Sequence, residues 1–205
     1  MAYPEPVEAL IDAFQRLPGI GRRSAERLTF HVLRDSQAGE LARAIERALS
    51  EAHRCGVCGN VSESELCNLC ADDERDATTV AVVEEPRHVE TLERAGVYHG
   101  RYHVLMGALN PADGTQERHL SLEHLVRRIR EEPIRELILA TDPDREGEAT
   151  ALLVLEAVES VGRPDLVITR LARGLPAGSA IEYLHRGVLQ DALEGRRPVR
   201  SKPRG

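Results

Sequence analysis

Hydrophobic residues in the first 50 positions recur at the spacing of α-helices. In the stretches 7–14, 28–32 and 41–49 they lie three or four positions apart, which places them on one face of a helix. These residues are Val7, Leu10, Ile11, Phe14, Leu28, Val32, Leu41, Ile45 and Leu49. Segment 18–21 separates the first two stretches and holds a proline and two glycines. Because such a segment cannot continue a helix, the pattern predicts a tight hairpin between two helices.

From residue 78 onward the pattern changes to short apolar runs rich in β-branched residues. The runs cover 79–83, 102–105, 137–140 and 166–169, and a helical pattern follows each of the first three. Apolar strands that alternate with helices are typical of a parallel sheet covered on both faces. The chain after residue 173 adds a turn rich in glycine and proline and a short helix around 181–184.

All four cysteines lie in residues 54–72, a polar segment with too little apolar material for a core of its own. Something other than burial must therefore stabilise it.

Together the patterns predict an α/β protein in four parts. These are a helical module at 1–53, the cysteine segment at 54–72, a domain with a mainly parallel sheet at 78–173 and a short C-terminal segment at 174–205.

The composition is that of a globular protein with an aliphatic core. Hydrophobic residues make up 41% of the 205 positions, but there is no Trp and only two Phe, so aromatic platforms for stacking nucleic-acid bases are not expected. No run of about 18 apolar residues occurs, and the N-terminus lacks the basic start and apolar stretch of a signal peptide. We therefore expect a cytoplasmic protein with no membrane partner.

The formal net charge of −7 argues against a uniformly basic surface for nucleic acid, but phosphate binding needs only local arginine and lysine. Two basic clusters satisfy that need. One consists of Arg22, Arg23 and Arg27; the other is the C-terminal tail with Arg196, Arg197, Arg200, Lys202 and Arg204. For the tail, a solvated chain end is the favoured alternative.

The hairpin segment 17–28, Leu-Pro-Gly-Ile-Gly-Arg-Arg-Ser-Ala-Glu-Arg-Leu, combines a turn, a helix start and a basic face. Its glycines expose backbone amides where the helix dipole favours a phosphate, and Arg23 and Arg27 lie one turn apart on the same face. The segment resembles a helix-hairpin-helix, which implies DNA contact through Arg22, Arg23 and Arg27. The alternative is an ordinary turn or a subunit-packing motif with solvated arginines.

The cysteines form two Cys-x-x-Cys motifs, Cys55 with Cys58 and Cys67 with Cys70, separated by eight residues. Two such turns can place four thiolates around one tetrahedral zinc ion. A closed four-thiolate site leaves no open position, so the ion would be structural. Disulfides are the rival, which the cytoplasmic expectation disfavours, and a redox pair would need one motif rather than two. His53 is the one nearby residue that could replace a cysteine as a ligand, although we expect it to be an ordinary surface histidine.

Acidic residues follow two of the predicted strands. Glu84 ends the first, and the loop after a later strand holds Asp142 and Asp144, with Glu148 in the helix beyond. Because parallel strands bring their carboxyl ends to one edge, these side chains can converge on a magnesium ion or meet a basic partner. Alternatively, the acidic loop caps the following helix. A glutamate on one strand and Asp-Pro-Asp on another resemble the Toprim domain of primases, type IA topoisomerases and related nucleases.

The order of these parts resembles the RecR family of bacterial recombination mediators: a hairpin, a four-cysteine segment, a Toprim-like domain and a short tail. Further stretches similar to the family lie at 100–105, 111–114, 146–151 and 169–178, so the resemblance covers nearly the whole chain. Topoisomerases and primases need a much longer chain, which favours RecR within the Toprim group.

The resemblance implies a non-enzymatic, nucleoid-associated protein of DNA repair and recombination. It implies a homo-oligomer, either a dimer or a ring-like tetramer that encircles DNA, with the hairpin and C-terminal segments making the subunit contacts. The implied partners are single-stranded and duplex DNA at gap junctions, RecO and RecF, and the implied role is to displace single-strand binding protein and load RecA. Arg23 and Arg27 occupy positions where the family presents basic residues to DNA.

One departure from the family keeps an enzymatic rival open. Many relatives lack one or both aspartates at the positions of Asp142 and Asp144, whereas this chain has the full acidic set. A small Toprim nuclease, with Glu84 and both aspartates holding a metal ion for phosphodiester hydrolysis, is therefore the main alternative. A zinc-bearing adaptor without DNA contact is a third. None of the tyrosines lies in a recognisable nucleophile context; they are Tyr3, Tyr98, Tyr102 and Tyr183.

Overall fold

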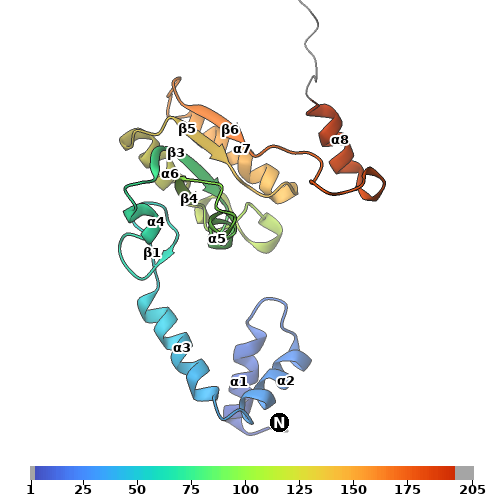
Figure 1. Ribbon diagram of the computed structural model, residues 1–205. Helices are drawn as coiled ribbons and strands as arrows, with labels where there is room; N and C mark the ends of the chain where they lie inside the picture. The colour runs from blue at the N-terminus through green and yellow to red at the C-terminus, as the bar shows by residue number, and fades with distance from the viewer. Residues whose placement is uncertain (1–2, 197–205) are drawn as a thin grey trace, which may run out of the picture. The chain divides into compact units, whose positions relative to one another are not determined.

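The computed structural model describes residues 3–196, and the tail beyond Arg196 lies outside the described residues. The chain divides into two compact units, one up to His53 and one from Arg54 onward. The first unit is helical, as predicted, and is drawn in blue in Figure 1. Its helices are α1 (Glu5–Gln15), α2 (Arg22–Val32) and α3 (Ala38–Glu51).

The predicted hairpin between the first two helices is confirmed. Ile11 of α1 packs in the same small interior as Ala25 and Thr29 of α2, and all three are fully buried. Gly19 in the turn has a φ of 75°, a left-handed conformation that favours glycine. The α3 helix is strongly amphipathic but buries no residue, so its apolar face is open in this unit.

The cysteine segment is a small element built on two short strands and one helical turn. They are β1 (His53–Arg54), β2 (Val61–Ser62) and α4 (Asn68–Ala71). The backbone N–H of Val104 donates to the Cys58 carbonyl at 2.8 Å, and Leu69 packs against both the cysteines and the neighbouring domain. The segment is therefore docked on the edge of the large sheet rather than hanging from a linker.

A four-stranded, fully parallel sheet forms the centre of the second unit (Figure 1). Its order is β4 (Gly100–Val104), β3 (Asp76–Val83), β5 (Glu136–Leu139) and β6 (Val167–Arg170). All four strands were predicted from the apolar runs. After β3 the chain forms β4 on one side of β3, and it later forms β5 on the opposite side of β3. The direction in which strands are added to the sheet therefore reverses beside β3. In such sheets this switch point is where sites form.

Helices cover both faces of the sheet, as the near-continuous apolar strands predicted. Val80 and Val82 face a core made with α6 (Leu122–Glu131) and α7 (Arg145–Glu159). Ala81 and Val83 point to the opposite face, where α5 (Pro86–Ala95) supplies Val89 and Leu92. The long connection before α6 contains two short 3₁₀ turns, η1 (Pro111–Asp113) and η2 (Glu117–His119).

The C-terminal segment differs in detail from the sequence expectation. The stretch around 181–184 is a single 3₁₀ turn, η3 (Ile181–Tyr183), and the true helix follows as α8 (Arg186–Glu194). The sequence does carry the pattern for α8, because Val188, Leu189, Ala192 and Leu193 recur at helical spacing, but the sequence analysis placed the helix one turn too early. Among the described residues, no helix has the length and apolar character needed to cross a bilayer.

Candidate functional site

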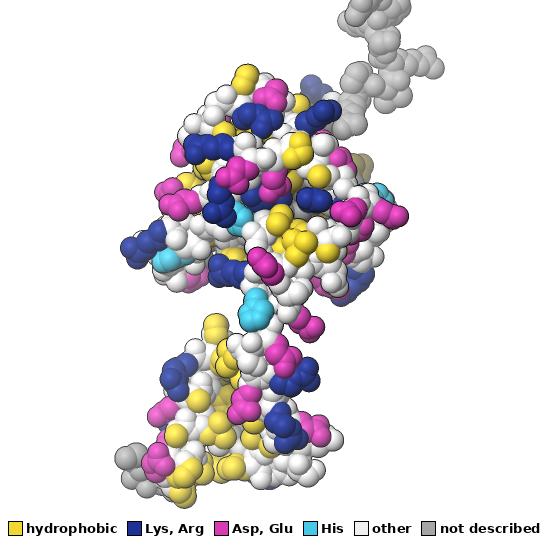
Figure 2. Space-filling model, turned by 90° about the vertical axis from the view of Figure 1, so that its left-hand side faces the viewer, with side chains coloured by type: hydrophobic (Ala, Val, Ile, Leu, Met, Phe, Trp, Pro, Cys, Tyr) yellow, Lys and Arg dark blue, Asp and Glu magenta, His cyan; other side chains and the backbone are white. Residues whose placement is uncertain are grey.

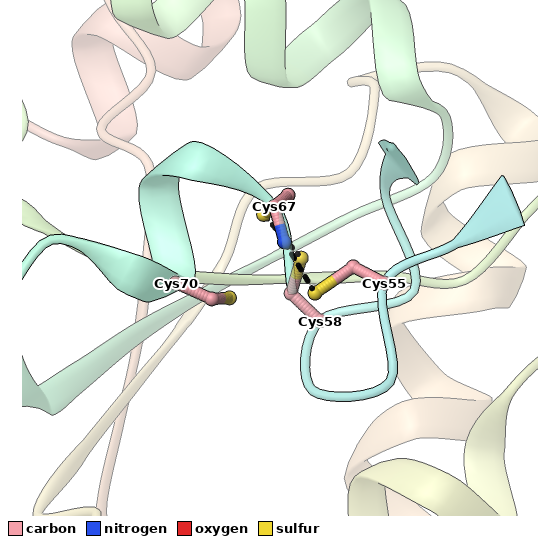
Figure 3. Close-up of side chains that lie close together, drawn as sticks. All are labelled: Cys55, Cys58, Cys67 and Cys70. Carbon is pink, nitrogen blue, oxygen red and sulfur yellow. Dashed lines mark hydrogen bonds between the residues drawn. The ribbon is translucent and has the colours of Figure 1, made fainter. Parts of the chain in front are cut away.

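The four cysteine side chains converge from two segments of the chain (Figure 3). Cys55 and Cys58 lie in the turn after β1. Cys67 directly precedes α4, and Cys70 lies within that helical turn. The four sulfur atoms lie within 4.8 Å of one another, and the Sγ atoms of Cys58 and Cys67 are 3.5 Å apart. A tetrahedral zinc ion with Zn–S bonds of about 2.3 Å spaces its sulfurs about 3.8 Å apart, so this arrangement fits zinc.

The electrostatics of the cluster also favour a bound cation. Burial opposes ionisation of Cys55, but backbone hydrogen bonds from Cys58 and Cys67 lower its pKa to about 6. The Cys58 pKa is raised, first by a hydrogen bond with the Cys70 side chain and then by burial. Burial at this spacing opposes ionisation of all four thiols together, and a cation that binds them as thiolates would remove that cost. All four cysteines are free of disulfides, and His53 is exposed and outside the cluster.

The three arginines of the hairpin have different surroundings. Arg22 is tied within its own unit, because its guanidinium lies 2.7 Å from a Glu8 carboxylate oxygen and 3.0 Å from one of Glu26. Arg23 and Arg27 are exposed, and within residues 3–196 neither forms an ion pair. These two are therefore the arginines available to an external phosphate, whereas Arg22 braces α2 against α1.

The start of α2 adds backbone donors to this basic face. Gly21 occupies the N-cap position and supplies no side-chain hydrogen bond to the helix. The first amides of the helix thus keep unused N–H groups at the positive end of its dipole. This helix start, with Arg23 and Arg27 free of ion pairs within residues 3–196, therefore has backbone and side-chain donors that an anion could use.

At the carboxyl ends of β3 and β5 the structure brings together only part of the predicted acidic set. Glu84 and Asp142 have carboxylate oxygens within 4.8 Å of each other and of a ring nitrogen of His88. The Asp142 backbone N–H donates to Glu84 Oε1 at 3.3 Å, and His88 Nε2 lies 3.6 Å from Asp142 Oδ2. The site is therefore a mixed cluster of two carboxylates and one imidazole.

The other two predicted acidic residues are engaged elsewhere. Asp144 is the N-cap of α7, and its Oδ1 accepts a hydrogen bond of 2.8 Å from the Gly147 backbone. Glu148 accepts two hydrogen bonds of 2.7 Å from Arg170 and also contacts Arg173. The capping alternative thus describes Asp144, and Glu148 joins the start of α7 to the end of β6 and the chain beyond it.

Gly147 allows the two halves of the acidic site to approach each other. A Cβ atom on this residue would overlap the Asp142 carbonyl oxygen and lie 2.9 Å from Glu84 Oε1. Only a residue without a side chain fits there, because atoms cannot come so close. The Gly147 position in the first turn of α7 therefore has a steric function.

Burial and charge repulsion act on Glu84. The residue is 4% exposed, and desolvation, followed by repulsion from Asp142 and Asp144, raises its pKa to about 7. The hydrogen bond from the Asp142 backbone opposes this rise without reversing it. A cation bound at this position would stabilise the ionised carboxylate.

His88 is the site residue that the sequence analysis missed. It lies four positions after Glu84, in the first turn of α5, and that turn folds back over the end of β3. Pro86 carried the signal, because proline is favoured at the first helical position and here starts the helix directly after the strand. With the helix start placed there, His88 must lie near Glu84.

Comparison with protein families agrees with the order of parts along the chain. Residues 7–49 match the helix-hairpin-helix of RecR, and residues 52–72 match the four-cysteine zinc finger domain of RecR. Residues 78–172 match the Toprim domain.

Curated relatives match over almost their full length. "Recombination protein RecR" of Rhodopirellula baltica is 46% identical over 93% of this chain and 95% of its own. The protein of the same name from Acidothermus cellulolyticus is 45% identical over 96% of this chain and 98% of its own. The one from Enterococcus faecalis is 39% identical over 97% of this chain and all of its own.

Proposed function

Because the chain belongs to the RecR family of recombination proteins, we propose that it is a DNA-binding mediator of recombinational repair that helps load RecA onto single-stranded gaps together with RecO and RecF. The observation that carries this proposal is the uncapped start of α2 beside Arg23 and Arg27, which form no ion pair within residues 3–196. Backbone amides and arginines of this kind contact phosphates without reading bases, which suits a protein that acts at gaps of any sequence. The proposed place of action is the bacterial cytoplasm, at the nucleoid.

In this proposal the three hairpin arginines have two roles. Arg23 and Arg27 contact DNA phosphates, and Arg22 holds the hairpin in shape through Glu8 and Glu26. The basic tail, which begins at Arg196, is a secondary candidate for DNA contact.

One structural zinc ion per chain is proposed at Cys55, Cys58, Cys67 and Cys70. The buried, converging thiols and the match to a four-cysteine zinc finger domain support it. The ion supplies folding energy to a segment that lacks an apolar core, and with four thiolates it has no position open for substrate.

A homo-oligomer, either a dimer or a ring-like tetramer around DNA, is proposed from the apolar surface of the helical module. Figure 2 shows hydrophobic side chains gathered on one face of this module. Its exposed large hydrophobic residues are Leu17, Leu33, Leu41, Ile45 and Leu49. Such a concentration is typical of protein contact surfaces. The C-terminal segment, with exposed Ile181 and Tyr183, is the second proposed contact region.

The acidic end of the sheet is proposed to bind a divalent cation and to meet a basic surface of a partner such as RecO, without cutting DNA. Cleavage needs an activated nucleophile aligned with the scissile phosphate. The Tyr98 hydroxyl donates to the Arg101 carbonyl at 2.8 Å, with the Thr79 carbonyl also close at 3.1 Å, and Tyr102 donates to Glu93, so both hydroxyls are held inside the fold. Burial raises the pKa of both phenols, which makes them poorer nucleophiles.

The test of DNA contact is affinity for gapped DNA over a range of salt concentrations. Phosphate contacts release counterions, so affinity is expected to fall steeply as salt rises. Affinity that does not depend on salt, or no binding at all, would favour an adaptor without DNA contact.

The second candidate function is a small metal-dependent nuclease, which the clustering of Glu84, Asp142 and His88 keeps in consideration. The test is incubation of the protein with labelled gapped DNA and magnesium or manganese, beside the variant Asp142→Asn, Asp144→Asn. The proposal predicts intact DNA in both reactions. Cleavage by the parent that disappears in the variant would move the protein into the nuclease class.

A further inference from the structure

The mixed cluster at the switch point of the sheet has the donor set of a particular class of metal ion. Glu84 reaches it from the end of β3, His88 from the first turn of α5 and Asp142 from the end of β5. Three separate elements therefore place ligand atoms within 4.8 Å of one another. The oxygen-rich loop alone would predict magnesium, but the histidine changes the chemistry.

Burial of Glu84 is a second observation that indicates a bound cation. The residue is 4% exposed, and among residues 3–196 no arginine, lysine or histidine nitrogen lies within 4.0 Å of its oxygens. Its Oε1 atom accepts one hydrogen bond of 3.3 Å, and no hydrogen bond of the described residues reaches Oε2. A buried carboxylate facing another carboxylate is costly unless a positive charge joins them.

The imidazole of His88 is also incompletely satisfied. Its side chain is 17% exposed, and its Nδ1 atom is buried without a hydrogen-bond partner among the described residues. Its Nε2 atom lies 3.6 Å from Asp142 Oδ2, longer than a hydrogen bond. Nε2 therefore faces Asp142 without a hydrogen bond, and it is the ring nitrogen that a cation in this cluster would take up.

We propose that Glu84, His88 and Asp142 bind one first-row divalent transition-metal ion of the zinc type in preference to magnesium. Magnesium takes oxygen ligands and keeps several waters, whereas imidazole nitrogen favours zinc, iron, cobalt or nickel. The inference rests on the cation-binding role proposed above for this end of the sheet, and it adds the class of ion and the ligand that selects it. Asp144 and Glu148 are occupied within the fold and are not ligands in this proposal.

The test uses the full chain with its four-cysteine site already filled with zinc. Further Zn²⁺ or Mg²⁺ is titrated in by calorimetry, and the bound ions are counted by elemental analysis after dialysis. The parent is expected to take up a second zinc ion and to bind it more tightly than magnesium. The variant His88→Gln should lose at least about tenfold in zinc affinity. Removing a residue that only hydrogen-bonds to a metal ligand already costs about tenfold, so removing a direct ligand should cost at least as much. The magnesium affinity of this variant should change far less.

Two further variants control for damage to the fold. Asp142→Asn removes a ligand whose side chain is 47% exposed, so it should weaken zinc binding without loss of thermal stability. His31→Gln changes an exposed histidine of α2 and should leave the second zinc site unchanged. Equal affinity of the parent for zinc and magnesium, or a His88→Gln variant that binds zinc like the parent, would overturn the inference while leaving a cation role intact. If neither ion binds, both the inference on the class of ion and the proposed cation-binding role are wrong. Salt-dependent DNA binding would still test the mediator role separately.

Discussion

At the scale of single residues, close approaches decide how the acidic end of the sheet is built. Glu84 is buried directly after β3, and Asp142 meets it through a backbone N–H rather than through its side chain. Gly147 makes this contact possible, since a side chain there would collide with both residues. The sequence shows that these residues are present, but which of them face one another depends on where α5 and α7 begin.

The first prediction concerns Gly147→Ala. The added Cβ would overlap the Asp142 carbonyl oxygen, so α7 must shift and the variant should lose at least about 2 kcal/mol of unfolding free energy. Chemical denaturation measures this loss. Gly39→Ala in α3, where the new atom would meet only an Arg43 nitrogen at 3.5 Å, is the matched control and should be neutral or stabilising. Similar stability of Gly147→Ala and the parent would show that the loop is not tightly packed.

A second prediction at this scale concerns Arg23→Ala combined with Arg27→Ala. Each arginine is expected to contact one phosphate, so the slope of log affinity against log salt should become shallower by about 1 per residue. Binding should weaken to a similar degree for all DNA sequences, while thermal unfolding is unchanged.

The control for that pair is Arg43→Ala with Arg47→Ala, which removes two exposed arginines four positions apart on α3. It should leave the salt dependence close to that of the parent. If the Arg23→Ala, Arg27→Ala variant also binds DNA like the parent, then the hairpin is a packing motif. The basic tail then becomes the next candidate for DNA contact.

At the scale of elements, the sequence predicted the sheet well and the helix starts less well. Each apolar run became a strand because a strand covered on both faces must be apolar at successive positions. His88 was not foreseen because apolar runs and spacing do not show that α5 begins at Pro86. Asp144 was grouped with the acidic site because a capping aspartate and a ligand aspartate look the same in sequence; in the structure its Oδ1 accepts a hydrogen bond from Gly147, so it has the capping role.

The third prediction concerns the four-cysteine element. Cys55→Ser should lower zinc content below one ion per chain and loosen the edge of the sheet, because the Val104 amide is bonded to the Cys58 carbonyl. Elemental analysis measures the zinc, and hydrogen exchange measures protection of the Val104 amide. Ile138, in the centre of the sheet, is the internal reference and should keep its protection. Full zinc occupancy in the variant, or unchanged protection at Val104, would contradict the assigned role.

At the scale of the whole molecule, the chain consists of a helical unit with little interior and an α/β unit with a full core. Of the described residues in the first unit, only Ile11, Ala25 and Thr29 are buried, while five large apolar side chains are exposed: Leu17, Leu33, Leu41, Ile45 and Leu49. The apolar pattern predicted the helices, but it could not distinguish an intramolecular core from a surface for a second copy. Both produce the same spacing in sequence.

The fourth prediction is that Ile45→Asp with Leu49→Asp disrupts self-association. Both side chains are exposed on α3, so the charges should not disturb the unit itself but would be buried in a subunit contact. Light scattering should show an oligomer for the parent and a smaller species for the variant. Val97→Asp, an exposed apolar position outside the proposed contact regions, is the control. A monomeric parent, with or without gapped DNA, would contradict the proposed homo-oligomer around DNA.

The central claim is that this protein helps to load a recombinase onto gapped DNA, and one kinetic measurement tests it most directly. Gapped DNA is first coated with single-strand binding protein, and the rate of RecA filament formation is then followed with RecO and either the parent or the Arg23→Ala, Arg27→Ala variant. The account predicts faster filament formation with the parent, a much smaller effect with the variant, and no cleavage of the DNA. A rate with the parent equal to that with RecO alone would contradict the account.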